Sequence, residues 1–327
     1  MTAEMISRQA NSLFRAPGRA IRIHRFGGPE VITLEDVVPR EPGEGEILLR
    51  VEAAGVGAWD AWIRAGKSVL PQPLPLTLGS DVSGIVETVG PGVTGFAPGE
   101  AVFGVTNPSF TDGYADYAIV LAAMSAKKPE TLSHIDAASV PVVAVTAWQA
   151  LFEQAQLKRG QSVLIHGAAG NVGAFAVQLA HRAGLGVHAT AGGRDLGYVR
   201  SLGADTVLDG HTARFEEILP SVDAVIDLVG GEVQARSFAV LSKGGALISA
   251  VTPPDQAIAA AHRARAAFFL VDVTTERLAR IAAMIEAGAL TTAVGAVLPL
   301  ASARLAHEML EGTRQRPRGK IVLRVGE

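Results

Sequence analysis

Three glycines recur at every third position in one short stretch of this chain: Gly167, Gly170 and Gly173. An apolar run, 162–166, precedes them, and a pattern typical of an amphipathic helix follows over 174–180. The first amides of such a helix lack intrahelical partners and lie at the positive end of its dipole, so they can bind a pyrophosphate. In this context the spacing predicts a dinucleotide-binding turn rather than an ordinary strand-to-helix turn. Its expected binding residues are Gly167, Ala169, Gly170, Asn171, Val172 and Gly173.

The strand expected at 186–191 ends where such a site holds the ribose of the adenosine half. NAD sites usually place Asp or Glu at this tip, whereas NADP sites remove that charge and add a cation. Here Gly192 is followed by Arg194, whose guanidinium can pair with a 2′-phosphate, and Tyr198 adds a hydroxyl. We therefore expect NADPH rather than NADH. Asp195 leaves the alternative open, because it either starts the next helix or competes for the ribose, and Arg194 can instead be a solvated surface residue.

The elements that position these residues alternate in type along the chain. Further apolar runs predict strands, and helix-compatible segments separate most of them. Such alternation of short strands and helices predicts right-handed βαβ units in a doubly wound parallel sheet, with ligands at the carboxyl ends of the strands. The expected strands are 186–191, 205–208, 222–228, 245–251 and 266–271, and the expected helices are 195–201, 213–219 and 234–241.

The chain before the glycine turn carries short strands separated by Pro and Gly, which predicts an irregular barrel. The expected strands are 20–24, 45–52, 82–89, 101–105 and 114–120. Two helices, 275–289 and 301–311, and a strand, 320–325, follow the last strand of the nucleotide domain and fit the first domain. We therefore expect an N-terminal extension over 1–19, a β-rich domain made of 20–140 and 273–327, and a nucleotide-binding domain over 141–272.

Several short motifs recur in an order and spacing that resemble one family. Besides the glycine turn, they lie at 25–31, 53–56, 90–93, 98–102, 202–205, 227–231 and 318–320. Together they resemble the medium-chain dehydrogenase/reductases, in their zinc-free, quinone-oxidoreductase-like branch, over about Ala20 to Val325. The resemblance implies an α/β fold with a GroES-like substrate domain, a Rossmann domain that binds NADPH, a cleft between them and a homodimer.

The resemblance also implies positions for further cofactor residues. It places Thr146 beside the nicotinamide or the pyrophosphate. It places five apolar residues along the cofactor edge: Val229, Ala250, Val251, Phe269 and Leu270. Each has an alternative interpretation, because Thr146 can cap a helix and apolar residues are ordinarily core.

The donor groups of a zinc site are missing. The chain contains no cysteine, and its eight histidines include no His-x-x-x-His pair. Zinc-bearing relatives carry Gly-His-Glu where this chain reads Gly79-Ser80-Asp81, and their cysteine after Ala-Gly is absent from 55–60. We expect no metal, and without a Lewis acid the reduction of an already polarised acceptor is favoured over alcohol dehydrogenation.

The expected reaction is hydride transfer from NADPH to a quinone or to the β-carbon of an α,β-unsaturated carbonyl. The proton donor is unassigned. Relatives often have Asn-Pro-x-Asp in a first-domain loop, and only Asp60 remains here as a weak candidate, with solvent as the alternative. Trp59 and Trp62 either stack on a planar acceptor or wedge that loop into the core. The alternative functions are an enoyl or 2-alkenal reductase, and a non-catalytic NADPH-binding sensor or structural protein.

Bulk properties fit a two-domain cytoplasmic enzyme. The 327 residues suffice for two cores. A formal net charge of −3 with 19% charged residues offers no basic stripe for nucleic acid. The apolar stretches are shorter than a membrane span, and no secretory signal is recognisable. Residues 1–19 look like an appendage: a disordered extension or an early start codon is favoured over an amphipathic targeting segment.

Overall fold

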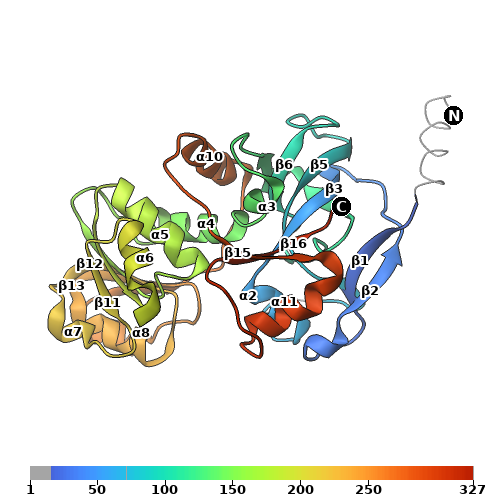
Figure 1. Cartoon of the computed structure of the whole chain (residues 1–327). Helices are drawn as coiled ribbons and strands as arrows, with labels where there is room; N and C mark the ends of the chain where they lie inside the picture. The colour runs from blue at the N-terminus through green and yellow to red at the C-terminus, as the bar shows by residue number, and fades with distance from the viewer. Residues whose placement is uncertain (1–15, 71, 327) are drawn as a thin grey trace. The chain divides into compact units, whose positions relative to one another are not determined.

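The computed structural model describes residues 16–70 and 72–326. They form two compact units. The first contains the described residues up to Pro141, then Val273–Glu286 and the chain from Thr292 onward; the second contains Val142–Asp272 and Ala287–Thr291. The chain thus leaves the first unit, builds the second and returns (Figure 1). Within the described residues, every helix is too short or too polar to cross a membrane.

Two sheets form the first unit. The smaller sheet is antiparallel, in the order β2 (Thr33–Val37), β1 (Gly18–Ile23), β4 (Leu76–Thr77). Gly18 and Arg19, assigned to the extension by the sequence pattern, already pair with Val37 and Asp36; the rest of that expected extension, 1–15, lies outside the described residues.

The larger sheet of the first unit has seven strands, and all its pairings except β15–β16 are antiparallel. Its long strand β3 pairs with three neighbours and supplies Ile47, Leu49 and Val51 to the core, because alternate side chains of a strand face one side. The order is β15 (Val294–Pro299), β16 (Lys320–Arg324), β3 (Glu46–Val56), β5 (Asp81–Val89), β6 (Ala101–Val105), β8 (Ser125–Lys127), with β7 (Tyr117–Leu121) also paired to β3.

Short helices complete the first unit. Its longest helix, α10 (Thr275–Glu286), buries Leu278, Ile281 and Ile285, which lie on one face at helical spacing. The others are η1 (Pro29–Val31), α2 (Ala58–Arg64), η2 (Ala122–Met124), α3 (His134–Ala137), η6 (Leu300–Ser302) and α11 (Ala303–Leu310).

A six-stranded parallel sheet forms the second unit. Its order is β11 (Thr206–Asp209), β10 (Gly186–Ala191), β9 (Ser162–Ile165), β12 (Val222–Asp227), β13 (Leu241–Ser249), β14 (Arg265–Phe268). Counted along the chain within this sheet, the order is 3-2-1-4-5-6, that of the doubly wound dinucleotide-binding fold. The order reverses between β9 and β12, so the carboxyl ends of these two strands mark the expected ligand crevice.

Helices connect these strands. The first, α4 (Pro141–Trp148), continues as a π-helix, η3 (Gln149–Gln154). Phe238 and Phe215 pack with Leu164, Val225 and Leu247 of the strands in the core of this unit. The remaining helices are α5 (Asn171–Arg182), η4 (Gly193–Asp195), α6 (Leu196–Ser201), α7 (Phe215–Ile218), α8 (Gly231–Ser237), η5 (Phe238–Val240) and α9 (Gln256–Ala261).

The predicted α/β fold class is confirmed, with local corrections. Strand β10 matches its expected range. Strand β13 begins at Leu241, four residues before the predicted start, because Leu241 pairs with Val222 across a bulge. The segment with Trp59 and Trp62, expected as a loop, is helix α2. The Asp60 carboxylate accepts a hydrogen bond from the Gly57 amide (2.8 Å) and so satisfies an amide at the start of this helix.

Candidate functional site

The glycine turn joins β9 to α5, as the sequence predicts. Gly167 has φ +70°, a conformation that glycine adopts without strain. A Cβ on Gly173 would lie 2.3 Å from the Gly167 carbonyl oxygen and 2.7 Å from the Ala168 Cα, so only glycine allows this close approach of helix and turn. In the part of the chain that the structure describes, no group accepts a hydrogen bond from the amides of Asn171, Val172 or Gly173. These amides are available to an anion at the start of a twelve-residue helix.

A buried histidine directly before this turn is hydrogen-bonded to two neighbouring elements. His166 ends the apolar run before Gly167, and its ring nitrogens lie 2.8 Å from Thr190 Oγ1 and 2.9 Å from Ser237 Oγ. Because Ser237 Oγ donates to the Val233 carbonyl, it accepts from Nε2–H, and Nδ1 accepts from Thr190. Burial lowers the pKa of His166 to about 4, so the ring is neutral. It therefore links β9, β10 and α8 without adding charge beneath the turn.

The tip of β10 carries the residues expected at the ribose. Arg194 is exposed in η4, and among the described residues it has no ion-pair partner. Tyr198 lies one turn further on in α6. Asp195 occupies the N-cap position of α6, but its side chain makes no capping hydrogen bond there. Of the two interpretations of Asp195, the backbone position fits a helix start.

Two residues at this tip were missed by the sequence analysis. A Cβ on Gly192 would lie 3.7 Å from His211 Nε2, and one on Gly193 would lie 2.8 Å from Asp209 Oδ2. Asp209 ends β11 and His211 lies two residues beyond it. Because β11 pairs with β10 in parallel, the carboxyl ends of the two strands meet. The neighbourhood thus combines Arg194 and the imidazole of His211 with one carboxylate, that of Asp209. The signal that could have found them is their place after a strand adjacent to β10.

The carboxyl ends of β12, β13 and β14 hold the apolar residues that the resemblance assigned to the cofactor edge. Val229 is 53% exposed and Leu270 is 54% exposed, whereas large apolar side chains are ordinarily buried. Ala250 and Val251 are half-buried, and Phe269 is buried.

The turn that carries Val229 is fixed by a buried carboxylate. Asp227 Oδ1 accepts from the amides of Val229 (3.0 Å) and Gly230 (2.8 Å). Its Oδ2 accepts from Gln234 Nε2 and Ser249 Oγ. These four bonds hold the end of β12 against α8 and β13. They fix the backbone at Val229 in a conformation that leaves its side chain exposed.

Thr146 does not cap a helix. It lies inside α4, is buried, and its Oγ1 donates to the Val142 carbonyl (2.7 Å). The hydroxyl oxygen keeps accepting capacity.

The tryptophans of α2 differ in environment. Trp62 is 47% exposed, whereas Trp59 is half-buried against the core of the first unit. Trp59 Nε1 donates to Ser80 Oγ (3.0 Å), and Lys320 Nζ lies 4.4 Å from the centre of a Trp59 ring. Trp59 thus matches the alternative of a residue wedged into the core, and Trp62 is the tryptophan open to a ligand.

Asp60 has no accessible surface. Its Oδ2 accepts from the Gly57 amide and from Tyr114 Oη (2.7 Å), and burial raises the pKa of Asp60 to about 7. These contacts make it a helix-capping and core residue, which gives no support to a role in proton delivery.

The residues at the family's metal position do not fit zinc. Ser80 Oγ accepts from Trp59, and the buried Asp81 carboxylate is paired with Lys320 Nζ at 2.8 Å. No group of three or more His, Asp or Glu side chains among the described residues could hold a metal ion. A donor set of one hydroxyl and one neutralised carboxylate lacks the nitrogen and sulfur ligands typical of zinc.

Comparison with known proteins shows which family the chain belongs to. A family profile described as "Alcohol dehydrogenase GroES-like domain" matches residues 43–130, and one described as "Zinc-binding dehydrogenase" matches 202–323. Quinone oxidoreductase from Rattus norvegicus is 34% identical over 311 residues, 89% of this chain and 93% of that protein.

The chain is also similar to solved structures of quinone oxidoreductases. The quinone oxidoreductase of Coxiella burnetii superposes with a TM-score of 0.88 at 33% identity, covering 95% of this chain and all of that one. The Escherichia coli quinone oxidoreductase complexed with NADPH has a TM-score of 0.84 at 27% identity, and the match covers 93% of this chain and 99% of that one. The chain therefore belongs to the medium-chain dehydrogenase/reductase superfamily, in its quinone-oxidoreductase-like branch, and is an oxidoreductase.

Proposed function

We propose that this protein is a zinc-independent reductase that takes its hydride from NADPH and delivers it to a quinone or to the β-carbon of an α,β-unsaturated carbonyl. The observation that carries the proposal is the glycine turn at the reversal point of the parallel sheet, with Arg194 directly after β10 and no acid within 186–194, while the nearby Asp209 carboxylate belongs to the neighbouring strand β11. The NADPH complex of the related Escherichia coli enzyme supports the choice of cofactor.

Different residues of the chain would bind different parts of the cofactor. The amides at the start of α5 would hold the pyrophosphate, and Arg194 with Tyr198 and His211 would hold the 2′-phosphate. Val229 and Leu270 would lie along the nicotinamide side of the cofactor, with Thr146 near it, and their apolar surfaces exclude water there. The nicotinamide supplies the hydride, and the protein sets orientation and field.

Atoms balance without a metal. A quinone that accepts a hydride and one proton becomes a hydroquinone, and an enone becomes the saturated carbonyl. The buried carboxyl of Asp60 has no route to solvent through its own surface, so we assign the proton to solvent. The exposed indole of Trp62 is our candidate for contact with the planar acceptor.

The cofactor assignment is tested with Arg194→Ala. Loss of a charge-assisted hydrogen bond to the 2′-phosphate is expected to weaken NADPH binding about tenfold or more while leaving NADH binding unchanged. Arg200→Ala, an exposed arginine at the end of α6, is the matched control and keeps NADPH affinity. Equal losses for NADPH and NADH, measured by nicotinamide fluorescence titration, would contradict the assignment.

The reaction is tested by stopped-flow NADPH oxidation with 1,4-benzoquinone, 9,10-phenanthrenequinone and a panel of small enones, with NADH as parallel donor. Turnover with quinones, with or without semiquinone, supports a quinone reductase, and turnover with enones alone supports the enoyl or 2-alkenal reductase. Tight NADPH binding without oxidation of any acceptor would overturn the proposal in favour of a sensor or structural protein. The same reaction run with a chelator tests zinc independence, because a zinc-dependent enzyme loses activity.

A homodimer is part of the proposal. The family resemblance supports it, and so does β14, which ends the parallel sheet with β13 as its only partner strand among the described residues. An uncovered edge strand offers backbone groups to a second copy. Light scattering at the mass of one chain would contradict this.

A further inference from the structure

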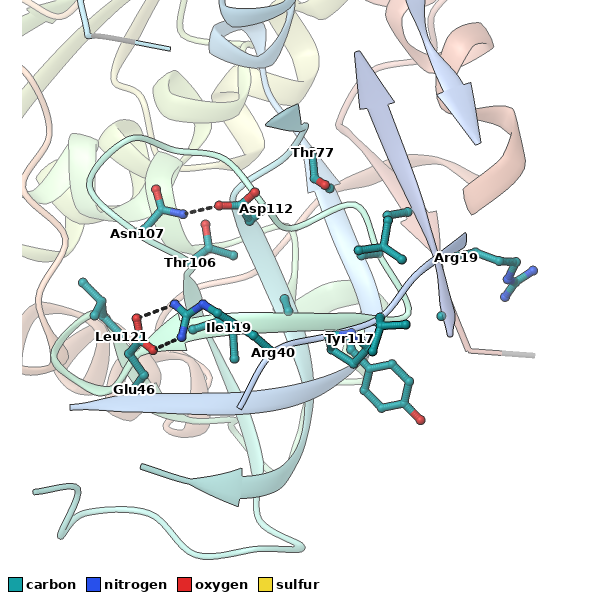
Figure 2. A pocket seen from close by; sticks show the side chains of 17 residues that line it. Arg19, Arg40, Glu46, Thr77, Thr106, Asn107, Asp112, Tyr117, Ile119 and Leu121 are labelled. Carbon is teal, nitrogen blue, oxygen red and sulfur yellow. Dashed lines mark hydrogen bonds and ion pairs between the residues drawn. The ribbon is translucent and has the colours of Figure 1, made fainter. Parts of the chain in front are cut away.

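A concave pocket of about 520 Å³ lies in the first unit, between the β1–β2 hairpin, the end of β7 and the loop that follows β6 (Figure 2). This volume is in the range of small-molecule sites. None of its lining residues belongs to the candidate cofactor site or includes Trp59 or Trp62. The pocket is therefore separate from the candidate cofactor site.

Four charged residues line the pocket, and three of them have partners. Arg40 is bonded to both carboxylate oxygens of Glu46, at 2.5 and 2.7 Å, as Figure 2 shows. Arg19 is bonded to both oxygens of Asp116. Asp112 has no cationic partner within 4.0 Å among the described residues. Within the described chain Asp112 thus has no direct ion pair, and the more distant guanidiniums of Arg40 and Arg22 favour its charged form only through space.

The Asp112 carboxylate is held in place but remains reachable. Its Oδ2 accepts from Asn107 Nδ2 and Thr111 Oγ1, both at 3.2 Å, and Figure 2 shows Asn107 beside it. Oδ1 accepts no hydrogen bond from the described residues. Asp112 is exposed, so this oxygen can be reached from solvent. Surrounding protein raises the pKa of Asp112 through desolvation, while the bonds from Thr111 and Asn107 favour the carboxylate. Oδ1 is therefore available to a donor that enters the pocket.

The rest of the lining is apolar or offers hydroxyl groups. Thr77 and Thr106 lie on the polar side with Asp112 and Asn107 (Figure 2). The apolar side is made by Val37, Val38, Pro39, Ala115, Ala118, Ile119 and Leu121. Val38 is 59% exposed, which is unusual for a large apolar side chain. An occupant must therefore present a cationic donor at one end and a short apolar body at the other.

We propose that this pocket binds a small organic monocation, a protonated primary or secondary amine whose N–H groups face Asp112 Oδ1 and whose hydrocarbon part lies against Val38 and Ile119. Both arginines of the wall are already paired with carboxylates, Arg19 with Asp116 and Arg40 with Glu46, so an anion gains little from them. A neutral isostere would leave the carboxylate desolvated and unpaired, which costs binding free energy. The site is distinct from the reductase site and does not depend on the proposed function.

The test is isothermal titration of the full chain with benzylamine, phenethylamine and cyclohexylamine, and with benzyl alcohol as the neutral analogue. The wild type is expected to bind the amines and not the alcohol. Asp112→Asn should weaken amine binding about tenfold or more, because a charge-assisted bond is lost. Asn also tolerates the φ of +76° at this position, so the loop keeps its conformation.

Two further variants keep the result interpretable. Asp36→Asn removes an exposed charge from the neighbouring strand β2, outside the pocket lining, and should leave binding unchanged. Val38→Ala trims the apolar side at an exposed position and should weaken binding severalfold, by about the free energy of two buried methyl-sized groups at most. Absence of amine binding by the wild type, equal binding by Asp112→Asn, or equal binding of benzyl alcohol would each overturn the proposal.

Discussion

Gly173→Ala is expected to separate the packing role of the third glycine from the phosphate role of the second. The added Cβ would lie 2.3, 2.7 and 2.9 Å from three backbone atoms of Gly167 and Ala168, which cannot rotate away. Overpacking of this kind costs about 1–3 kcal/mol, and overlap with backbone places it at the upper end. Alanine regains up to about 1 kcal/mol of helix propensity, so the net loss in the free energy of unfolding is about 2 kcal/mol.

Gly170→Ala is the matched variant. A Cβ there would meet only the Gly167 carbonyl oxygen, at 3.2 Å, and the backbone angles of φ −73° and ψ 170° are ordinary for alanine. Its stability should remain near that of the wild type, while the methyl group occupies the space expected for the phosphate and weakens NADPH binding. Gly173→Ala should lose both stability and binding, because α5 and its amides must shift.

Thermal unfolding by circular dichroism and nicotinamide fluorescence titration measure the two effects. A loss of about 2 kcal/mol corresponds to a fall in Tm of several degrees. If Gly173→Ala unfolds at the wild-type temperature and binds NADPH with wild-type affinity, then α5 does not pack on the turn as described. If Gly170→Ala lowers Tm as much as Gly173→Ala does, the separation of roles is wrong.

Two further predictions concern buried ionisable groups. His166 is neutral in the folded protein to about pH 4, whereas in the unfolded chain it protonates below about pH 6.5, so the free energy of unfolding should fall as the pH drops through this interval, by about 1.4 kcal/mol per unit at most. Urea titrations at several pH values should show a shallower dependence for His166→Gln, and an unchanged dependence would refute this. Lys320→Met removes the ammonium that is paired with the buried Asp81 carboxylate and should cost about 3–5 kcal/mol, most of it recovered in the double variant Asp81→Asn with Lys320→Met. A double variant as unstable as the single one would show that the charge of Asp81 is not the cause.

The sequence predicts the parallel sheet well because its strands are short apolar runs whose pattern and order suffice. The range 186–191 is reproduced by β10, and the glycine turn lies between β9 and α5 as expected. Helix α2 was missed because its start depends on a carboxylate three residues inside it, Asp60, and on a glycine N-cap, a weak signal in a region full of turns.

The residues missed at the site share one cause: their contacts join segments far apart in the chain. Asp209 and His211 approach Gly192 and Gly193 because two parallel strands end together, which no local pattern reveals. The exposed Val229 and Leu270 could not be told from core residues by composition, since exposure is a property of the folded edge. The sequence could not show which of Trp59 and Trp62 packs in the core and which is open to a ligand. The hydrogen bond of Trp59 to Ser80 and its contact with Lys320 distinguish the two.

Because the ring of His166 stays neutral, it adds no pH-dependent charge next to the glycine turn. A support that stays uncharged from about pH 5 to 8 gives the phosphate-binding amides a constant electrostatic potential over that range. If the proposed site holds the coenzyme, a change in its affinity across this range is expected to come from the second ionisation of the 2′-phosphate, near pH 6, and not from the turn. The two ends of the proposed binding surface are thus expected to respond differently to acidity: the pyrophosphate end keeps a constant charge, and the end expected to hold the 2′-phosphate changes with the charge of that phosphate.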